Sequence, residues 1–94
     1  MKCGGWTVNP KMDIIKLSGN EEKAFREVIA KLKDGMEYAP VLYAGWQLVS
    51  GLNHIFICKA RPHGEREWSS LVRMQIYAPL SEPAELSDIE PIIK

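Results

Sequence analysis

The 94-residue sequence predicts an α+β fold, in which one amphipathic helix packs on an antiparallel sheet of four to five strands. Two observations support this prediction. Apolar residues recur at helical spacing over residues 20–34, and beyond residue 40 short runs of strand-forming residues alternate with turns. Because a chain of this length builds one small core, we expect a single domain over residues 1–94.

The predicted helix covers about residues 20–34. Ser18 and Asn20 are candidate N-caps, and the acidic residues that follow suit the positive end of the helix dipole. Gly35 is a suitable C-terminal stop. The apolar positions form one stripe that must pack against a sheet. These positions are Ala24, Phe25, Val28, Ile29, Leu32 and Met36.

The rest of the chain is predicted to form strands and turns. The apolar residues at 14, 15 and 17 suit a short strand or an anchoring contact. Later strands are expected at residues 41–47, 52–60, 68–77 and 84–93, and Pro91 suits an edge position in the last of these. Alternation over residues 52–60 puts His54, Phe56, Cys58 and Ala60 on one face, which we assign to the core.

Composition excludes several classes of function. With 46% hydrophobic residues and no formal net charge, the chain is not a disordered protein. The 12 basic and 12 acidic residues lie in both halves, which argues against a nucleic-acid partner. No apolar run approaches the roughly 20 residues of a membrane helix. No signal-peptide core follows Met1, so we expect a cytoplasmic protein without a membrane partner.

The sequence does not predict an enzyme, a metal site or a cofactor. Cys58 and His54 are the one pair that could act as nucleophile and base. Four residues along a strand span roughly 13 Å, which is too far for a hydrogen bond between them. Cys58 is therefore expected to be a small core residue. His54 and His63 lie nine residues apart, with no metal-ligand spacing beside them.

A motif lies between two of the predicted strands. Gln47, Val49 and Gly51 form the pattern Gln-x-Val-x-Gly, which resembles the first hairpin turn of the cystatins, inhibitors of papain-like cysteine proteases. The context is similar: a Gly-Gly pair near the N-terminus, one long helix, Asn53 after the motif and a second turn with Pro79. The absence of a disulfide framework resembles the stefin branch of that family.

The resemblance implies a cystatin-like fold and reversible, non-covalent inhibition of a papain-like cysteine protease. The N-terminal segment and two hairpin turns would form a wedge that fills the active-site cleft. Gly51 would let the backbone turn sharply and approach the partner closely. The implied protease-binding residues are Gly4, Gly5, Gln47, Leu48, Val49, Ser50, Gly51, Ala78, Pro79 and Leu80.

Alternatives to inhibition remain open. The motif also suits an ordinary hairpin, and the glycine pair suits a plain chain terminus. The chain could be a cystatin-like interaction or ligand-binding module without protease inhibition. Ile55 and Ile57 on the outer face would then favour a homodimer or a strand-swapped dimer. Trp6 is interpreted as an anchor on the domain body, and Trp46 as a residue that packs against a neighbouring strand.

Overall fold

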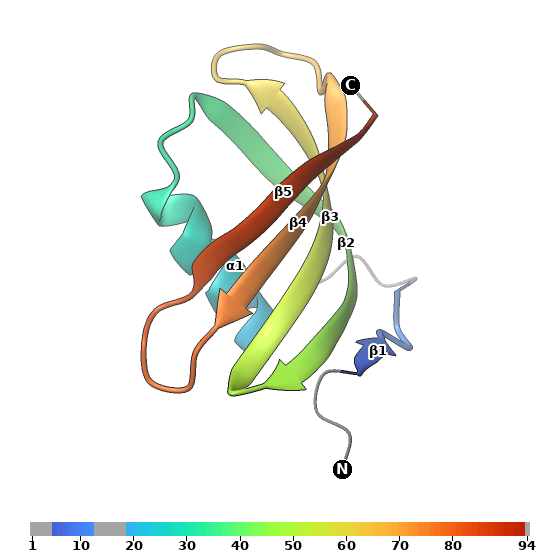
Figure 1. Cartoon of the computed structure of the whole chain (residues 1–94). Helices are drawn as coiled ribbons and strands as arrows, with labels where there is room; N and C mark the ends of the chain where they lie inside the picture. The colour runs from blue at the N-terminus through green and yellow to red at the C-terminus, as the bar shows by residue number, and fades with distance from the viewer. Residues whose placement is uncertain (1–4, 13–18, 94) are drawn as a thin grey trace.

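The computed structural model describes residues 5–12 and 19–93. Within them, one helix packs on one face of a five-stranded antiparallel sheet with the order β1-β2-β3-β4-β5 (Figure 1). This confirms the predicted α+β class. The elements in chain order are β1 (Trp6–Val8), α1 (Gly19–Lys31), β2 (Met36–Val49), β3 (Gly51–Pro62), β4 (Ser70–Ala78) and β5 (Glu85–Ile93).

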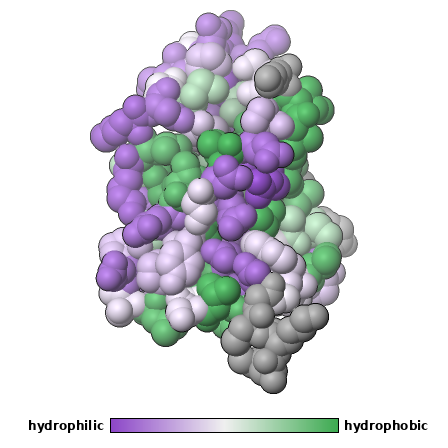
Figure 2. Space-filling view, in the orientation of Figure 1, coloured by the Kyte–Doolittle hydropathy of each residue, from purple (hydrophilic) through white to green (hydrophobic). Residues whose placement is uncertain are grey.

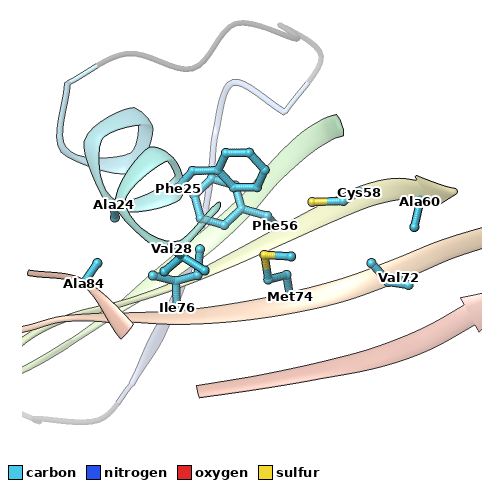
Figure 3. Close-up of a cluster of buried hydrophobic side chains, with 10 residues drawn as sticks. All are labelled: Ala24, Phe25, Val28, Phe56, Cys58, Ala60, Val72, Met74, Ile76 and Ala84. Carbon is cyan, nitrogen blue, oxygen red and sulfur yellow. The ribbon is translucent and has the colours of Figure 1, made fainter. Parts of the chain in front are cut away.

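The core lies between α1 and the middle of the sheet. Phe25 of α1 packs on Phe56 of β3, with 5.2 Å between the ring centroids (Figure 3). Burial of one such side chain contributes about 1.5–3 kcal/mol. The predicted core face of β3 is confirmed, because its four alternating residues are all buried. The buried apolar residues are Ala24, Phe25, Val28, Phe56, Cys58, Ala60, Val72, Met74, Ile76 and Ala84.

The helix is shorter than predicted, and the strand after it is longer. Helix α1 ends at Lys31, and Met36 begins β2 instead of extending the helical stripe. Gly35 therefore lies in the connection, where its carbonyl accepts a hydrogen bond from the His63 amide at 2.8 Å. Pairing with β3 begins at once, because Met36 lies opposite Pro62. The predicted short strand at 41–47 is the second half of a 14-residue strand.

Pro40 explains why the sequence predicted only the part of β2 that follows it. A proline lacks the amide that a central strand needs, so it indicates a strand boundary. In the structure Pro40 stays in β2, opposite Cys58, and the register shifts between Pro40 and Leu42. A second shift follows between Tyr43 and Gly45. These irregularities let the strand continue past the proline.

Strand β1 is an element that the sequence did not predict. Its three residues pair with β2, and Thr7 lies opposite Trp46. The pairing needs a glycine in β2, because a Cβ atom at Gly45 would lie 2.2 Å from the Thr7 carbonyl oxygen. Asn9 extends the contact, since its side-chain amide donates to the Tyr43 carbonyl at 2.8 Å. The strand or anchor expected at residues 14–17 lies outside the described residues.

At the end of the sheet far from β1, charged residues stack on an aromatic ring. The Arg61 guanidinium lies 4.1 Å from the Trp68 ring centroid, and the Lys59 ammonium lies 5.1 Å from it. Arg61 also pairs with Glu37 of β2 at 3.3 Å. These contacts hold the loop between β3 and β4 against the sheet.

The surface is mixed in character. Hydrophilic residues follow β5 across the face in Figure 2, and hydrophobic patches lie on both sides of them. Arg73 of β4 pairs with Asp88 and Glu90 of β5, at 2.6 and 3.4 Å. In the described part of the chain, no helix has the length and apolar character that crossing a membrane requires.

Candidate functional site

The segments that the sequence singled out meet at one end of the sheet. The turn between β2 and β3, residues 47–51, is called here the first turn, and residues 78–80 after β4 the second turn. Trp6 lies opposite Gln47, and Leu52 lies opposite Ala78. The N-terminal strand, the first turn and the second turn therefore share the lower end of the molecule in Figure 1. Gly5 directly precedes Trp6, whereas Gly4 lies outside the described residues.

The first turn is tight and internally held. Val49 pairs with Gly51, so Ser50 alone occupies the tip. Gly51 has a φ of +113°, a conformation that side chains other than hydrogen rarely allow. The Tyr77 hydroxyl donates a 2.5 Å hydrogen bond to the Ser50 carbonyl. The tip is thus fixed from the neighbouring strand β4, and its backbone shape does not depend on a partner.

Gly51 makes its close approach within the chain. A Cβ atom at this position would lie 2.3 Å from the Ala78 carbonyl oxygen and 3.0 Å from the Pro79 Cα. Gly51 is also buried. The sequence had assigned the small size of this residue to contact with a partner surface. The geometry corrects that interpretation, because the glycine allows the first and second turns to lie against each other.

The Gln47 side chain is oriented across the hairpin. Asn53, which lies opposite it, donates a 2.7 Å hydrogen bond from Nδ2 to the Gln47 Oε1. The amide oxygen bonds the hairpin itself, which gives Asn53 and Tyr77 supporting roles that the motif alone did not indicate.

Apolar side chains are exposed at this end. Leu48 of the first turn is 49% exposed and Leu80 of the second turn is 86% exposed. Val49, Ala78 and Pro79 are only partly exposed. Hydrophobic residues are visible between hydrophilic ones at the lower end of Figure 2. The two leucines are therefore the apolar groups that these turns present to a partner.

Trp6 is a surface residue that the sequence misplaced. It was interpreted as an anchor, but 48% of its surface is exposed, and it lies beside the first turn. A single tryptophan near a chain end gives no sequence signal that distinguishes a buried anchor from an exposed side chain. Trp46 instead stacks on Tyr43 of the same strand, with 6.1 Å between centroids and 14° between the ring planes, whereas the sequence predicted packing against a neighbouring strand.

A groove lies behind the two turns, against the first half of α1. Its volume is about 640 Å³. Lys23 and Glu27 line it from the helix, Leu48 and Leu52 from the hairpin, and Leu80 from the second turn. The buried His54 of β3 also lines the groove. The two turns therefore have one surface toward solvent and another toward this groove.

His54 is held as a neutral imidazole. It is 1% exposed, and its Nδ1 lies 2.7 Å from the Tyr43 hydroxyl. Burial lowers the pKa of His54 below its ordinary value, and the charge of Glu21 opposes this effect only in part. The other nitrogen, Nε2, is buried without a hydrogen-bond partner among the described residues.

The chemistry available to Cys58 is limited. The thiol is buried, and desolvation raises its pKa to about 12, so it is not a thiolate at neutral pH. No three His, Cys, Asp or Glu side chains in residues 5–12 and 19–93 are grouped to hold a metal ion. The candidate functional site consists of the exposed turns and the groove behind them.

Comparison of the chain with protein-family models, with curated proteins and with solved structures returns no significant match.

Proposed function

We propose that this protein is a reversible, non-covalent inhibitor of papain-like cysteine proteases, with a cystatin-like arrangement of its binding segments. The N-terminal segment, the first turn and the second turn together enter the protease cleft. The observation that carries the proposal is the exposure of Leu48 and Leu80, one on each of two turns that touch through Gly51.

The rigidity of the turns supports this proposal. A binding surface that is already ordered loses less conformational entropy on association. The Ser50 carbonyl is held by Tyr77, and the Gln47 amide oxygen by Asn53. These bonds leave the leucine side chains as the groups that lose water on contact. A handful of such apolar anchors typically contributes most of the affinity of an interface.

The same arrangement suits an inhibitor that is not cut. A protease cleaves a peptide bond that lies extended in its cleft at the attack distance. The first turn is a tight hairpin whose backbone is paired up to Val49 and again from Gly51. Such a turn offers side-chain contact but no extended peptide bond for attack. Blocking of substrate then follows from occupancy of the cleft.

The first experiment is a titration of papain, at micromolar inhibitor concentration, with wild-type protein and two variants. Leu48→Asp should raise the inhibition constant about 100-fold, because a carboxylate would lose water without a partner at the interface. Leu48→Ala should raise it about fivefold, since it removes one apolar contact worth about 1 kcal/mol. Leu48 is half exposed, so neither change should disturb the core.

The matched control is Ile92→Asp. Ile92 is 52% exposed, close to the 49% of Leu48, and lies near the C-terminal end of β5, away from both turns. It should leave the inhibition constant unchanged. Absence of inhibition by the folded wild-type protein against papain and a cathepsin would refute the proposal. Equal effects of Leu48→Asp and Ile92→Asp would move the contact surface elsewhere.

A further inference from the structure

The groove behind the turns has the size and lining of a small-molecule site. Such sites usually measure about 300–1,000 Å³ and combine apolar walls with a few placed polar groups. This groove measures about 640 Å³. Leucine and proline side chains line the groove, and the buried His54 is one of its polar lining groups.

The unpartnered nitrogen of His54 points to a ligand. A buried polar atom without a hydrogen bond costs about 1–3 kcal/mol, so native proteins rarely leave one unmatched. The Nδ1 side of the ring faces Tyr43 of β2. His54 lines the groove, and its Nε2 is buried without a hydrogen-bond partner among the described residues. The second turn, which follows β4, also lines the groove.

The hydrogen bond to Tyr43 determines what Nε2 offers. A phenol is a stronger hydrogen-bond donor than a neutral imidazole N–H, and an imidazole nitrogen is a stronger acceptor than a phenol oxygen. Burial raises the pKa of Tyr43, so its hydroxyl keeps its proton. The Tyr43 hydroxyl therefore donates to Nδ1, and the imidazole proton resides on Nε2. The group that His54 has left for a ligand is therefore a hydrogen-bond donor, the Nε2–H.

The charges on the lining argue against an anionic ligand. Lys23 is the cationic side chain that lines the groove among the described residues, while Glu27 and Glu82 also line it. One Glu27 oxygen already accepts a hydrogen bond from the Ala84 amide at 3.1 Å. Two carboxylates beside one ammonium would repel a carboxylate or phosphate. A cation would meet the N–H of His54 unfavourably, so the lining suits an uncharged acceptor.

We infer that the groove binds an uncharged, mainly apolar small molecule whose carbonyl oxygen accepts a hydrogen bond from His54 Nε2. The leucines of the two turns cover the apolar part of this molecule. Because Nε2 is buried, an exposed lining side chain such as Leu48 must shift to admit the oxygen. The inference does not require protease inhibition, although Leu48 and Leu80 serve both proposals.

The test uses two matched probes, N-acetyl-leucine methylamide and N-acetyl-leucine as its carboxylate. Binding is followed by NMR of the imidazole nitrogens in protein labelled with ¹⁵N, without any protease present. The amide should bind in the millimolar range and shift the Nε2 resonance of His54. The carboxylate should bind at least tenfold more weakly, because of Glu27 and Glu82.

Two variants and one control sharpen the assignment. His54→Phe keeps the ring but removes the donor, and should weaken amide binding at least tenfold. His63→Phe is the same change at the other histidine, whose side chain is 79% exposed outside the groove, and should leave binding unchanged. Leu80→Lys changes a residue that is 86% exposed, so it should fold normally, and should improve carboxylate binding relative to the amide at least threefold.

Three results would overturn the inference. The first is a His54 resonance that does not move at saturating amide. The second is a carboxylate that binds as well as the amide in the wild-type protein. The third is equal amide binding by wild type and a folded His54→Phe protein. If His54→Phe does not fold, the probe selectivity of wild type and Leu80→Lys decides the matter alone.

Discussion

At position 51 a glycine is required for two separate reasons. Its φ of +113° disfavours any side chain, and a Cβ atom would meet the Ala78 carbonyl oxygen at 2.3 Å. The sequence motif indicated the first reason, because glycine commonly ends a tight turn. The second depends on how the turns pack, which no local pattern contains. A substitution at Gly51 would disturb the fold, so Leu48 is the better position for testing inhibition.

His54 gives a residue-scale prediction about pH. Its pKa in the folded protein is lowered by burial, while in the unfolded chain it returns to the ordinary 6.5. Below pH 6.5 the unfolded state therefore binds more protons, and the free energy of unfolding falls as the pH falls. The loss is at most about 1.4 kcal/mol per pH unit for one proton, and it ends at the pKa that His54 has in the folded protein. Urea unfolding at pH 7, 6 and 5 should show this slope in wild type and a smaller one in His54→Phe.

The second histidine provides the comparison for that measurement. His63 is largely exposed and lies 3.3 Å from Glu37, so His63→Phe should retain most of the wild-type slope between pH 6.5 and 5. Equal slopes in wild type and His54→Phe would show that His54 is not buried as a neutral group.

At the scale of elements, the sequence predicted what strong periodicity specifies. The stripe through Phe25 and Val28 and the alternation through Phe56 repeat over several turns or residue pairs, and the elements that carry them are confirmed. Strand β1 is too short to show a period. The first half of β2 was missed because Pro40 suggests a boundary, while pairing with β3 and a register shift keep it in the sheet.

Strand β1 gives the element-scale prediction. Removing residues 1–5 should weaken protease inhibition about ten- to a hundredfold, since a few lost side-chain contacts are worth roughly 1–3 kcal/mol. Removing residues 1–8 should weaken it further, because the exposed Trp6 beside Gln47 is then lost as well. Both proteins should keep α1 and strands β2 to β5, which thermal unfolding can check. Unchanged inhibition by both would show that the N-terminal segment takes no part.

At the scale of the whole molecule, the sheet separates two ends with different chemistry. The chain measures 45 × 28 × 22 Å, and β3 runs along it from the first turn at Gly51 to the charged cluster at Arg61. Ten residues of strand span roughly 33 Å. The Gln-x-Val-x-Gly motif predicted a turn at the Gly51 end of β3. Composition alone could not predict the charged cluster at the Arg61 end. The cluster depends on Trp68, which reaches Arg61 only once the loop between β3 and β4 folds back.

This separation leads to the last prediction, that stability and inhibition can be changed independently. Trp68→Ala removes the ring that Arg61 and Lys59 stack on and should lower the free energy of unfolding by about 1–2 kcal/mol. It should leave the papain inhibition constant unchanged. At physiological salt, charges separated by more than about 8 Å are largely screened, so the cluster does not act on the turns through its field.

Leu80→Asp is the complementary variant for this test. Because Leu80 is 86% exposed, the change should leave the melting temperature nearly unchanged and weaken inhibition strongly. Differential scanning calorimetry and papain titration on both variants measure the two effects side by side. A Trp68→Ala protein that is fully folded at the assay temperature, yet inhibits more than tenfold less well, would show that the two ends are coupled. The sheet would then transmit strain from its charged end to its apolar one.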